Sequence, residues 1–210
     1  GVGKTTLIHA FVRQSMARHR RLVAAAGRCT ARGGVGDPFL PFREILQTLT
    51  GDIEAHRAGG AISSEHARRL WALFPEAVDA LLDEGPDLIG RFVPAEPLVL
   101  RAQAFAPGES AWQTRLQAAT TRRERDDAEE TNQMGLFDQV TRVLEALAGQ
   151  HPLILVVDDL QWADAGTASL LFHLACRLSG HRVLILAAYR PGDLGPRADG
   201  RPHAIESVVH

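Results

Sequence analysis

The stretch Gly1-Val2-Gly3-Lys4-Thr5-Thr6 opens the chain and decides its fold. It matches the second half of the phosphate-binding P-loop pattern G-x-x-x-x-G-K-[ST], whose loop leads from a strand into a helix. Gly3 has no Cβ, so backbone N–H groups there can approach phosphate oxygens closely. We expect Lys4 to reach the β- and γ-phosphates and the Thr5 hydroxyl to bind Mg²⁺. The residues predicted to contact the nucleotide are Gly1, Gly3, Lys4, Thr5 and Thr6.

Lysine usage supports this interpretation. Lys4 is the only lysine in the chain, and every other basic side chain is an arginine or a histidine. A compact ammonium and a planar guanidinium are not interchangeable at a phosphate site, which gives a reason to keep lysine at this position. The alternative for these residues taken alone is an ordinary glycine-rich turn.

Composition excludes several classes of protein. The 210 residues are 45% hydrophobic and 23% charged, with a net charge of −2, as in an ordinary soluble globular protein. The charge gives no general attraction to nucleic acid. The sequence has no run of about 18 apolar residues, so no membrane span is expected. Cys29 and Cys176 are predicted to be small core residues in a reducing cytoplasm, rather than a disulfide or a metal site.

The first part of the chain alternates helix and strand. Leu7 and Phe11 form one apolar i,i+4 pair, and Ile8 and Val12 form another, which predicts an amphipathic helix ending near residue 18. A short buried strand is predicted over 22–29. A helix followed by a strand, directly after a P-loop, indicates a parallel sheet.

The middle of the chain is predicted to be mostly helical at first. A helix begins near Pro41 and ends at Gly51, and another is capped by Ser63 or Ser64. In the second helix the apolar stripe of Leu70, Trp71 and Phe74 is interpreted as core and not as a ligand cage. Pro75 is expected to begin a separate short helix that closes at Gly85-Pro86.

The segment from Asp87 to Glu130 has the least regular pattern. Prolines and Gly108 interrupt its first part, and charges of alternating sign follow at 122–127. We expect a loop or lid-like insertion with partial disorder, or a helical and loop insertion over about 87–132, within a single partial P-loop domain over 1–210. No second complete domain is expected.

The second informative stretch is Leu153–Asp164, LILVVDDLQWAD, which follows a helix with apolar residues from Leu136 to Leu147. Five consecutive large aliphatic residues predict a central parallel strand buried on both faces. Asp158 would hold Mg²⁺, as in a Walker B motif, and Asp159 would orient the attacking water. Aspartate is shorter than the glutamate usual at this place, so hydrolysis is expected to be slow. The alternative is a pair of carboxylates that cap the next helix.

The last predicted strand is Val183–Tyr189, also expected to be buried, and Arg190 follows it. Arg190 is expected to reach the γ-phosphate as a sensor, and the alternative is a plain exposed arginine. Asp164 is expected to cap the helix between the two strands. Trp162 is expected to pack beneath the site, and the alternative is that it marks a partner surface.

Together, these motifs resemble the AAA-16/STAND-type ATPase module of large bacterial multidomain regulators. The resemblance rests on GVGKTT, on DPFLPF at 37–42, on DDLQWAD and on Ala188-Tyr189-Arg190-Pro191. Such modules occur in LuxR-type transcription factors, in cyclase-linked ATPases and in proteins with TPR arrays. The resemblance covers most of the chain, from the P-loop to Arg190.

The resemblance implies a three-layer α/β/α P-loop fold with a parallel sheet in the order 5-1-4-3-2. The chain is expected to be truncated, so that strand 1 and the last strand are missing. It implies ATP and Mg²⁺ as ligands, with Lys4, Asp159 and Arg190 in the catalytic roles and Thr5 and Asp158 at the metal. It also implies a cytoplasmic nucleotide switch that self-associates in the ATP state and meets nucleic acid only through a domain outside this chain.

Two other functions share the core motifs. A small-molecule P-loop kinase would need an acceptor pocket and a mobile lid, which the segment 87–130 could supply. A DNA-handling AAA+ ATPase of the origin-recognition or clamp-loader type would be stimulated by DNA. A nucleotide-binding scaffold without turnover is a further alternative.

Overall fold

The computed structural model describes residues 3–31, 38–54, 62–105, 111–125, 133–190 and residue 205. The chain divides into two compact units, one of Gly1–Ile45 with His151–His210 and one of Leu46–Gln150. The boundary lies within helix α2 (Leu40–Leu49).

The first unit is built on a parallel sheet. Within the described residues its three strands have the order β1-β2-β3. Their bounds are Val23–Arg28 for β1, Leu153–Asp158 for β2 and Val183–Ala187 for β3. The register pairs Val23 with Leu153 and Leu153 with Val183. The three strands correspond to strands 2, 3 and 4 of the expected order, which confirms that part of it.

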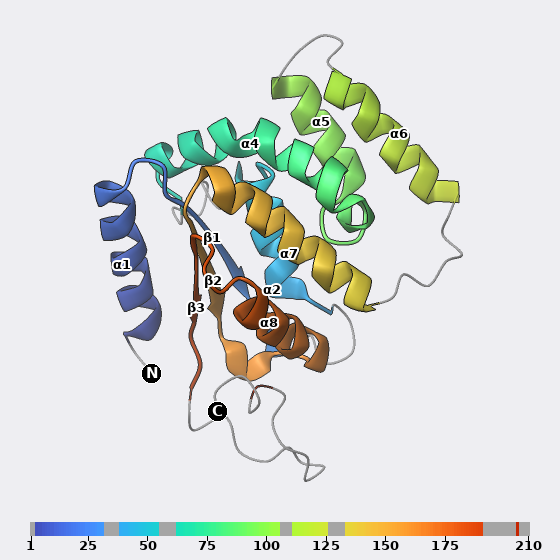
Figure 1. Ribbon diagram of the computed structural model, residues 1–210. Helices are drawn as coiled ribbons and strands as arrows, with labels where there is room; N and C mark the ends of the chain where they lie inside the picture. The colour runs from blue at the N-terminus through green and yellow to red at the C-terminus, as the bar shows by residue number, and fades with distance from the viewer. Residues whose placement is uncertain are drawn as a thin grey trace. The chain divides into compact units, whose positions relative to one another are not determined.

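Helices cover both faces of this sheet. Figure 1 shows α1 (Lys4–Arg18) on one side of the strands and α8 (Ala165–Arg177) on the other, as a three-layer α/β/α fold requires. A short 3-10 helix, η3 (Leu160–Trp162), follows β2. Asp164 caps α8 as expected, because its Oδ1 accepts a hydrogen bond of 2.9 Å from the backbone N–H of Thr167.

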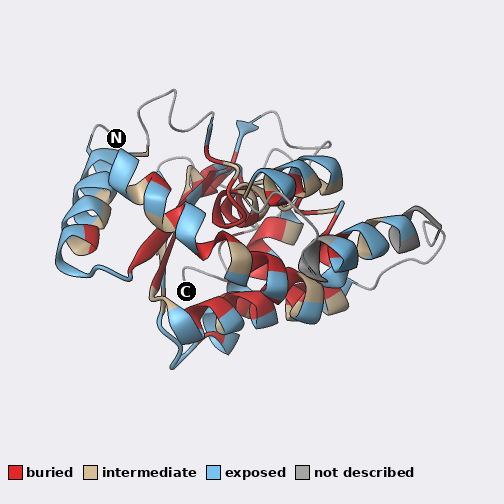
Figure 2. Ribbon diagram, turned by 90° about the horizontal axis from the view of Figure 1, so that it is seen from above, coloured by how far each residue is buried: buried red, intermediate tan, exposed pale blue. Residues whose placement is uncertain are grey.

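The sheet core follows from the strand sequences. The first five residues of β2 are buried, so the strand is covered on both faces, as its unbroken aliphatic run predicts. On the face toward α1, Met16 packs with Leu22, Ala24, Ile154 and Val156. Figure 2 shows the contrast between the largely buried strands β1 and β2 and the largely exposed surface of α1.

Gly27 of β1 marks a close approach of two backbones. A Cβ built there would lie 1.9 Å from the carbonyl oxygen of Pro41, which belongs to the backbone and cannot turn away. Only glycine allows the first turn of α2 to lie this close to the strand.

Helix α1 is less buried than its sequence predicts. Ile8 and Val12 pack against the core, whereas Leu7 and Phe11 are exposed. The prediction of two buried apolar pairs is therefore right for one pair. A helix that lies on a sheet buries a single stripe, and Leu7 and Phe11 lie outside that stripe.

Two further predictions about burial in this unit are wrong. Strand β3 is only partly buried, because within the described part of the chain β2 is its one neighbour in the sheet. Cys176 is exposed, since it lies on the outer side of α8. Cys29 is buried as expected, and both cysteines are free. Burial, with smaller contributions from nearby carboxylates led by Asp164, raises the pKa of the Cys29 thiol to about 12.

The second unit is helical. Its elements are α4 (Ser64–Glu84), η2 (Pro86–Leu88), α5 (Ala95–Phe105), α6 (Ala111–Arg125) and α7 (Gln133–Gln150). Ser63 caps α4 through a hydrogen bond from the backbone N–H of His66, and Gly85 ends it. Helix α7 packs its buried stripe against α4. Asp87 and Gln139 join η2 to α7 through two hydrogen bonds of 2.9 and 2.6 Å.

Two predictions in this unit need correction. Pro75 does not begin a new helix, because α4 runs unbroken from Ser64 to Glu84 with the proline inside it. A proline in a helix interior costs about 3 kcal/mol, but the buried stripe continues through Leu73, Phe74 and Val78 and outweighs this cost. The segment 87–125 is largely helical where it is described, and residues 126–132 lie outside the described part.

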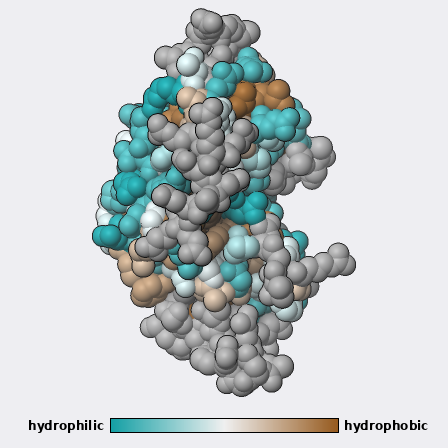
Figure 3. All heavy atoms as spheres, turned by 90° about the vertical axis from the view of Figure 1, so that its right-hand side faces the viewer, coloured by the Kyte–Doolittle hydropathy of each residue, from teal (hydrophilic) through white to brown (hydrophobic). Residues whose placement is uncertain are grey.

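Figure 3 shows one face, on which hydrophobic areas among the described residues are small and separated by hydrophilic ones.

Candidate functional site

The carboxyl ends of the three strands meet at one edge of the sheet, because all three strands are parallel. Arg28 ends β1 directly opposite Asp158, which ends β2. Asp159 follows Asp158, and Arg190 lies shortly after β3. In open α/β sheets this edge is where ligands bind. The sequence-predicted acids and Arg190 therefore share one end of the sheet.

The N-terminus of α1 is open. Gly3 precedes the helix with φ 131°, a conformation that side chains disfavour, and no side chain caps the first turn. The first turn also contains no acidic residue, and Lys4, Thr5 and Thr6 are all exposed there. A helix start with free backbone N–H groups attracts anions. Gly1, also predicted to contact nucleotide, lies outside the described residues.

Thr5 and Asp158 meet across the site. The Thr5 hydroxyl donates a hydrogen bond of 3.2 Å to Asp158 Oδ2, although the two residues lie 153 positions apart. A hydroxyl and a carboxylate oxygen are ligands that Mg²⁺ accepts, with water and phosphate oxygens completing its octahedron. The described residues hold no group of three or more His, Cys, Asp or Glu that could enclose a metal without such added ligands. The pair therefore suits a magnesium ion that arrives with a phosphate chain.

Asp159 has an unusual backbone and a restrained side chain. Its φ of 52° and ψ of 41° place it in the left-handed region, which costs free energy for any residue except glycine. Arg28 holds Asp159 Oδ2 with Nε at 2.6 Å and with Nη2 at 2.5 Å. Gln161 donates to Asp159 Oδ1 at 3.0 Å. Both carboxylate oxygens therefore accept hydrogen bonds from the protein itself.

These contacts determine the protonation of Asp159. Partial burial alone would raise its pKa, but the hydrogen bonds from Arg28 and Gln161, with the charges of Arg28 and Arg190, outweigh burial and lower it. The same pairing raises the pKa of Arg28. Asp159 is a carboxylate at neutral pH, and it is a weaker base than a free aspartate.

Gln161 links the ends of β2 and β3. Its side-chain oxygen accepts a hydrogen bond of 3.2 Å from the backbone N–H of Arg190, while its nitrogen donates to Asp159. Backbone bonds join the same segments, since Leu160 N–H donates to the Ala188 carbonyl at 2.8 Å. A shift of the Arg190 backbone would therefore move Gln161 and change its hydrogen bond to Asp159.

Two exposed side chains lie near this edge. Arg190 is exposed, and its guanidinium acts on Asp159 through charge rather than through a described hydrogen bond. Trp162 is half exposed and does not pack beneath the site, so that prediction is wrong. The residue after it, Ala163, is buried instead, because η3 turns its apolar side inward through Leu160 and Ala163.

Sequence reasoning missed Arg28, Glu44 and Gln161. Glu44 Oε2 accepts a hydrogen bond of 2.7 Å from the backbone N–H of Arg28 and so fixes the end of β1. A signal for Arg28 did exist, because it lies near the end of the strand predicted over 22–29, and parallel strands end at one edge. The partner of that arginine could not be identified without the register.

The family model of the AAA ATPase domain matches residues 1–186. No curated protein and no solved structure matches the chain. Among the described residues, no helix is both long and apolar enough to cross a membrane.

Proposed function

This chain belongs to the AAA ATPase domain family, and from that premise we propose that it binds ATP with Mg²⁺ and hydrolyses it slowly. The observation that carries the proposal is the meeting of Thr5 and Asp158, 3.2 Å apart at the carboxyl edge of the sheet. These two residues would hold Mg²⁺, which when bound neutralises charge on the phosphates. Gly3 and the first turn of α1 would receive the phosphate chain, and Lys4 would lie against its outer phosphates.

Slow turnover follows from the state of Asp159. A residue that orients the attacking water needs a free carboxylate oxygen. In Asp159, Arg28 occupies Oδ2 and Gln161 occupies Oδ1. Hydrolysis then requires one of these hydrogen bonds to open, and the lowered pKa makes the carboxylate a weaker proton acceptor.

We further propose that the module is a cytoplasmic nucleotide switch within a signalling or transcriptional regulator, and that its ATP form self-associates. Support comes from the DDLQWAD string beside GVGKTT and from the coupling of Arg190 to Asp159 through Gln161. A γ-phosphate that draws Arg190 toward it would move Gln161 and thereby change the restraint on Asp159.

Equilibrium binding of a fluorescent ATP analogue, with and without Mg²⁺, tests the proposal. We expect Mg²⁺-dependent binding to the unaltered protein, weak binding to Lys4→Ala, and binding without Mg²⁺ dependence to Thr5→Ala. Arg21→Ala is the matched control, since Arg21 is exposed and distant from the carboxyl edge of the sheet. Equal binding to the unaltered protein and Lys4→Ala, or no binding to either, would contradict the nucleotide site.

A further inference from the structure

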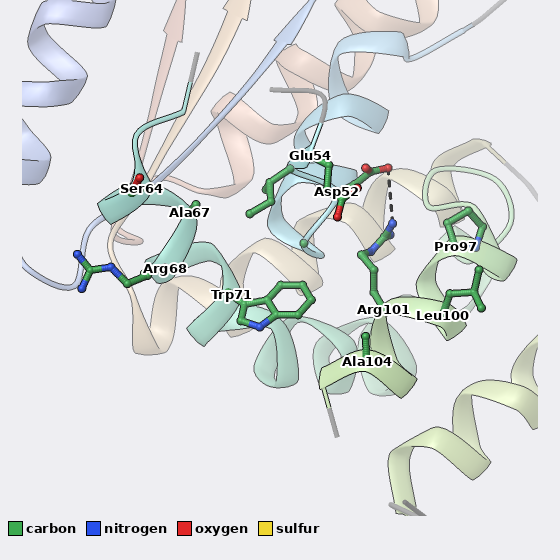
Figure 4. A pocket seen from close by; sticks show the side chains of 12 residues that line it. Asp52, Glu54, Ser64, Ala67, Arg68, Trp71, Pro97, Leu100, Arg101 and Ala104 are labelled. Carbon is green, nitrogen blue, oxygen red and sulfur yellow. Dashed lines mark ion pairs between the residues drawn. The ribbon is translucent and has the colours of Figure 1, made fainter. Parts of the chain in front are cut away.

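The second unit contains a pocket of about 600 Å³ that the ATPase chemistry does not use. Three described segments line it: residues 51–54, the first part of α4, and α5 from Pro97 to Ala104. Figure 4 shows Trp71 and Arg101 facing this space from the two helices, with Asp52 beside the arginine. The volume lies within the range of small-molecule sites.

Trp71 provides a rigid apolar wall. Its ring stacks on Phe74 at a centroid distance of 5.5 Å and meets Phe105 edge-on at 5.8 Å. Gly51 lies against the same ring, and a Cβ there would come within 3.2 Å of it. Although these contacts fix the ring, Trp71 remains 36% exposed. A large flat aromatic surface is therefore held in place at the wall of the pocket.

Arg101 provides a charge with unused hydrogen-bond donors. Its side chain is only 14% exposed. Nε donates to the Thr50 carbonyl at 3.0 Å, and Nη1 lies 3.6 Å from Asp52 Oδ2, beyond hydrogen-bond distance. Nη2 is buried and has no partner among the described residues. An unsatisfied buried donor costs free energy that a bound acceptor would recover.

The carboxylates around the pocket limit how much negative charge the bound acceptor can carry. Asp52 and Glu54 both line the pocket, so a polyphosphate would be repelled. Asp52 is 43% exposed, and its loose pair with Arg101 is therefore weak. A single carboxylate can replace Asp52 at Nη1, and a turn of the guanidinium would then bring the buried Nη2 to its second oxygen, in the fork geometry that arginine prefers.

We propose that this pocket binds a small molecule that has one carboxylate and a flat apolar body, with the carboxylate on Arg101 and the body on Trp71. Nothing in this proposal depends on ATP binding, since every residue it uses belongs to the second unit.

The test is a titration of the protein with a panel of aromatic and alicyclic carboxylates, led by phenylacetate and indole-3-acetate, each beside its neutral amide. The readout is the indole N–H resonance of Trp71, assigned with Trp71→Phe. We expect the acids to shift this resonance and to bind about ten-fold more tightly than the amides, the effect of one charged hydrogen bond. Arg101→Met should abolish the difference between acid and amide, whereas Arg68→Met, at the rim, should keep it.

Two further variants show whether a loss of carboxylate binding comes from the pocket itself or from another cause. Ala104→Trp fills the pocket without altering Arg101, and it should prevent both acid and amide from binding even if Arg101→Met fails to fold. Lys4→Ala should leave carboxylate binding unchanged, which separates this proposal from the nucleotide site. Equal binding of acids and amides, continued binding to Ala104→Trp, or no shift with any member of the panel would overturn the proposal.

Discussion

The pair of Arg28 and Asp159 should slow ATP hydrolysis, and breaking it should speed the reaction. The perturbation is Arg28→Met, which keeps a long side chain but removes the hydrogen bond from Nε at 2.6 Å and the ion-pair contact of Nη2 at 2.5 Å to Asp159 Oδ2. Gln161 would still hold Oδ1 at 3.0 Å, so the carboxylate would keep its place with one oxygen free.

The expected change in kcat depends on how strongly solvent screens the pair of Arg28 and Asp159. A hydrogen bond to a charged group contributes about 1.5–3 kcal/mol when well shielded, and an exposed ion pair contributes about 0.2–1 kcal/mol. Asp159 is 14% exposed but Arg28 is 66% exposed, so solvent screens the pair strongly. A value of about 1 kcal/mol is therefore reasonable, and it corresponds to about a five-fold rise in kcat.

The pH dependence has a definite sign. Asp159 has a lowered pKa, so its stabilising pair is present above the usual aspartate pKa and is lost as pH falls through the lowered value. Arg28→Met should bring the pKa back toward its ordinary range. The acid limb of the pH–rate profile, where Asp159 becomes protonated, should therefore move to higher pH.

The assay is steady-state phosphate release at saturating Mg²⁺ and ATP. Arg21→Met serves as the control for loss of one exposed arginine, and Asp159→Asn should abolish turnover whether or not Arg28 is present. An unchanged kcat in Arg28→Met, with an unchanged pH profile, would refute the restraint. A lower kcat together with weaker ATP binding would instead place Arg28 in contact with the nucleotide.

Three other predictions concern stability and reactivity. Asp164→Ala should lower the free energy of unfolding by about 1 kcal/mol in urea titration, because it removes the cap of α8. Asparagine also caps helices, so an equally large loss in Asp164→Asn would contradict the capping role. Gly27→Ala should lower the free energy of unfolding by about 3 kcal/mol, since the added Cβ meets a backbone oxygen at 1.9 Å. Gly149→Ala should raise it slightly, because a Cβ there meets nothing within 4 Å. Equal changes in the two variants would contradict the close approach at Gly27. Cys176 should react with a thiol reagent in the native protein at neutral pH and Cys29 only after unfolding, because burial raises the Cys29 pKa to about 12; mass mapping of early modification at Cys29 would disprove it.

The sequence by itself determined the elements that have strong local signals. The aliphatic run of β2 can only be a strand buried on both faces, and the spacing of apolar residues predicts α7. The caps at Ser63 and Asp164 were also predictable, because a short polar side chain before an apolar run satisfies the first N–H groups of a helix. The assignment of the two acids after β2 to the candidate site followed from the rule that ligands bind at the carboxyl ends of parallel strands.

Only the tertiary structure decided which distant groups meet. The contact between Thr5 and Asp158, and that between Arg28 and Asp159, depend on strand register and on the placement of α1, which no local pattern contains. The continuity of α4 through Pro75 likewise depends on the burial of the stripe on both sides of it. Local helix propensity differs by less than about 1 kcal/mol between ordinary residues and by about 3 kcal/mol for proline, and packing over a whole helix face exceeds it. The motifs therefore identify the ends of the strands as the place of chemistry, while the packing of those ends determines that Asp159 is held by an arginine and not left free.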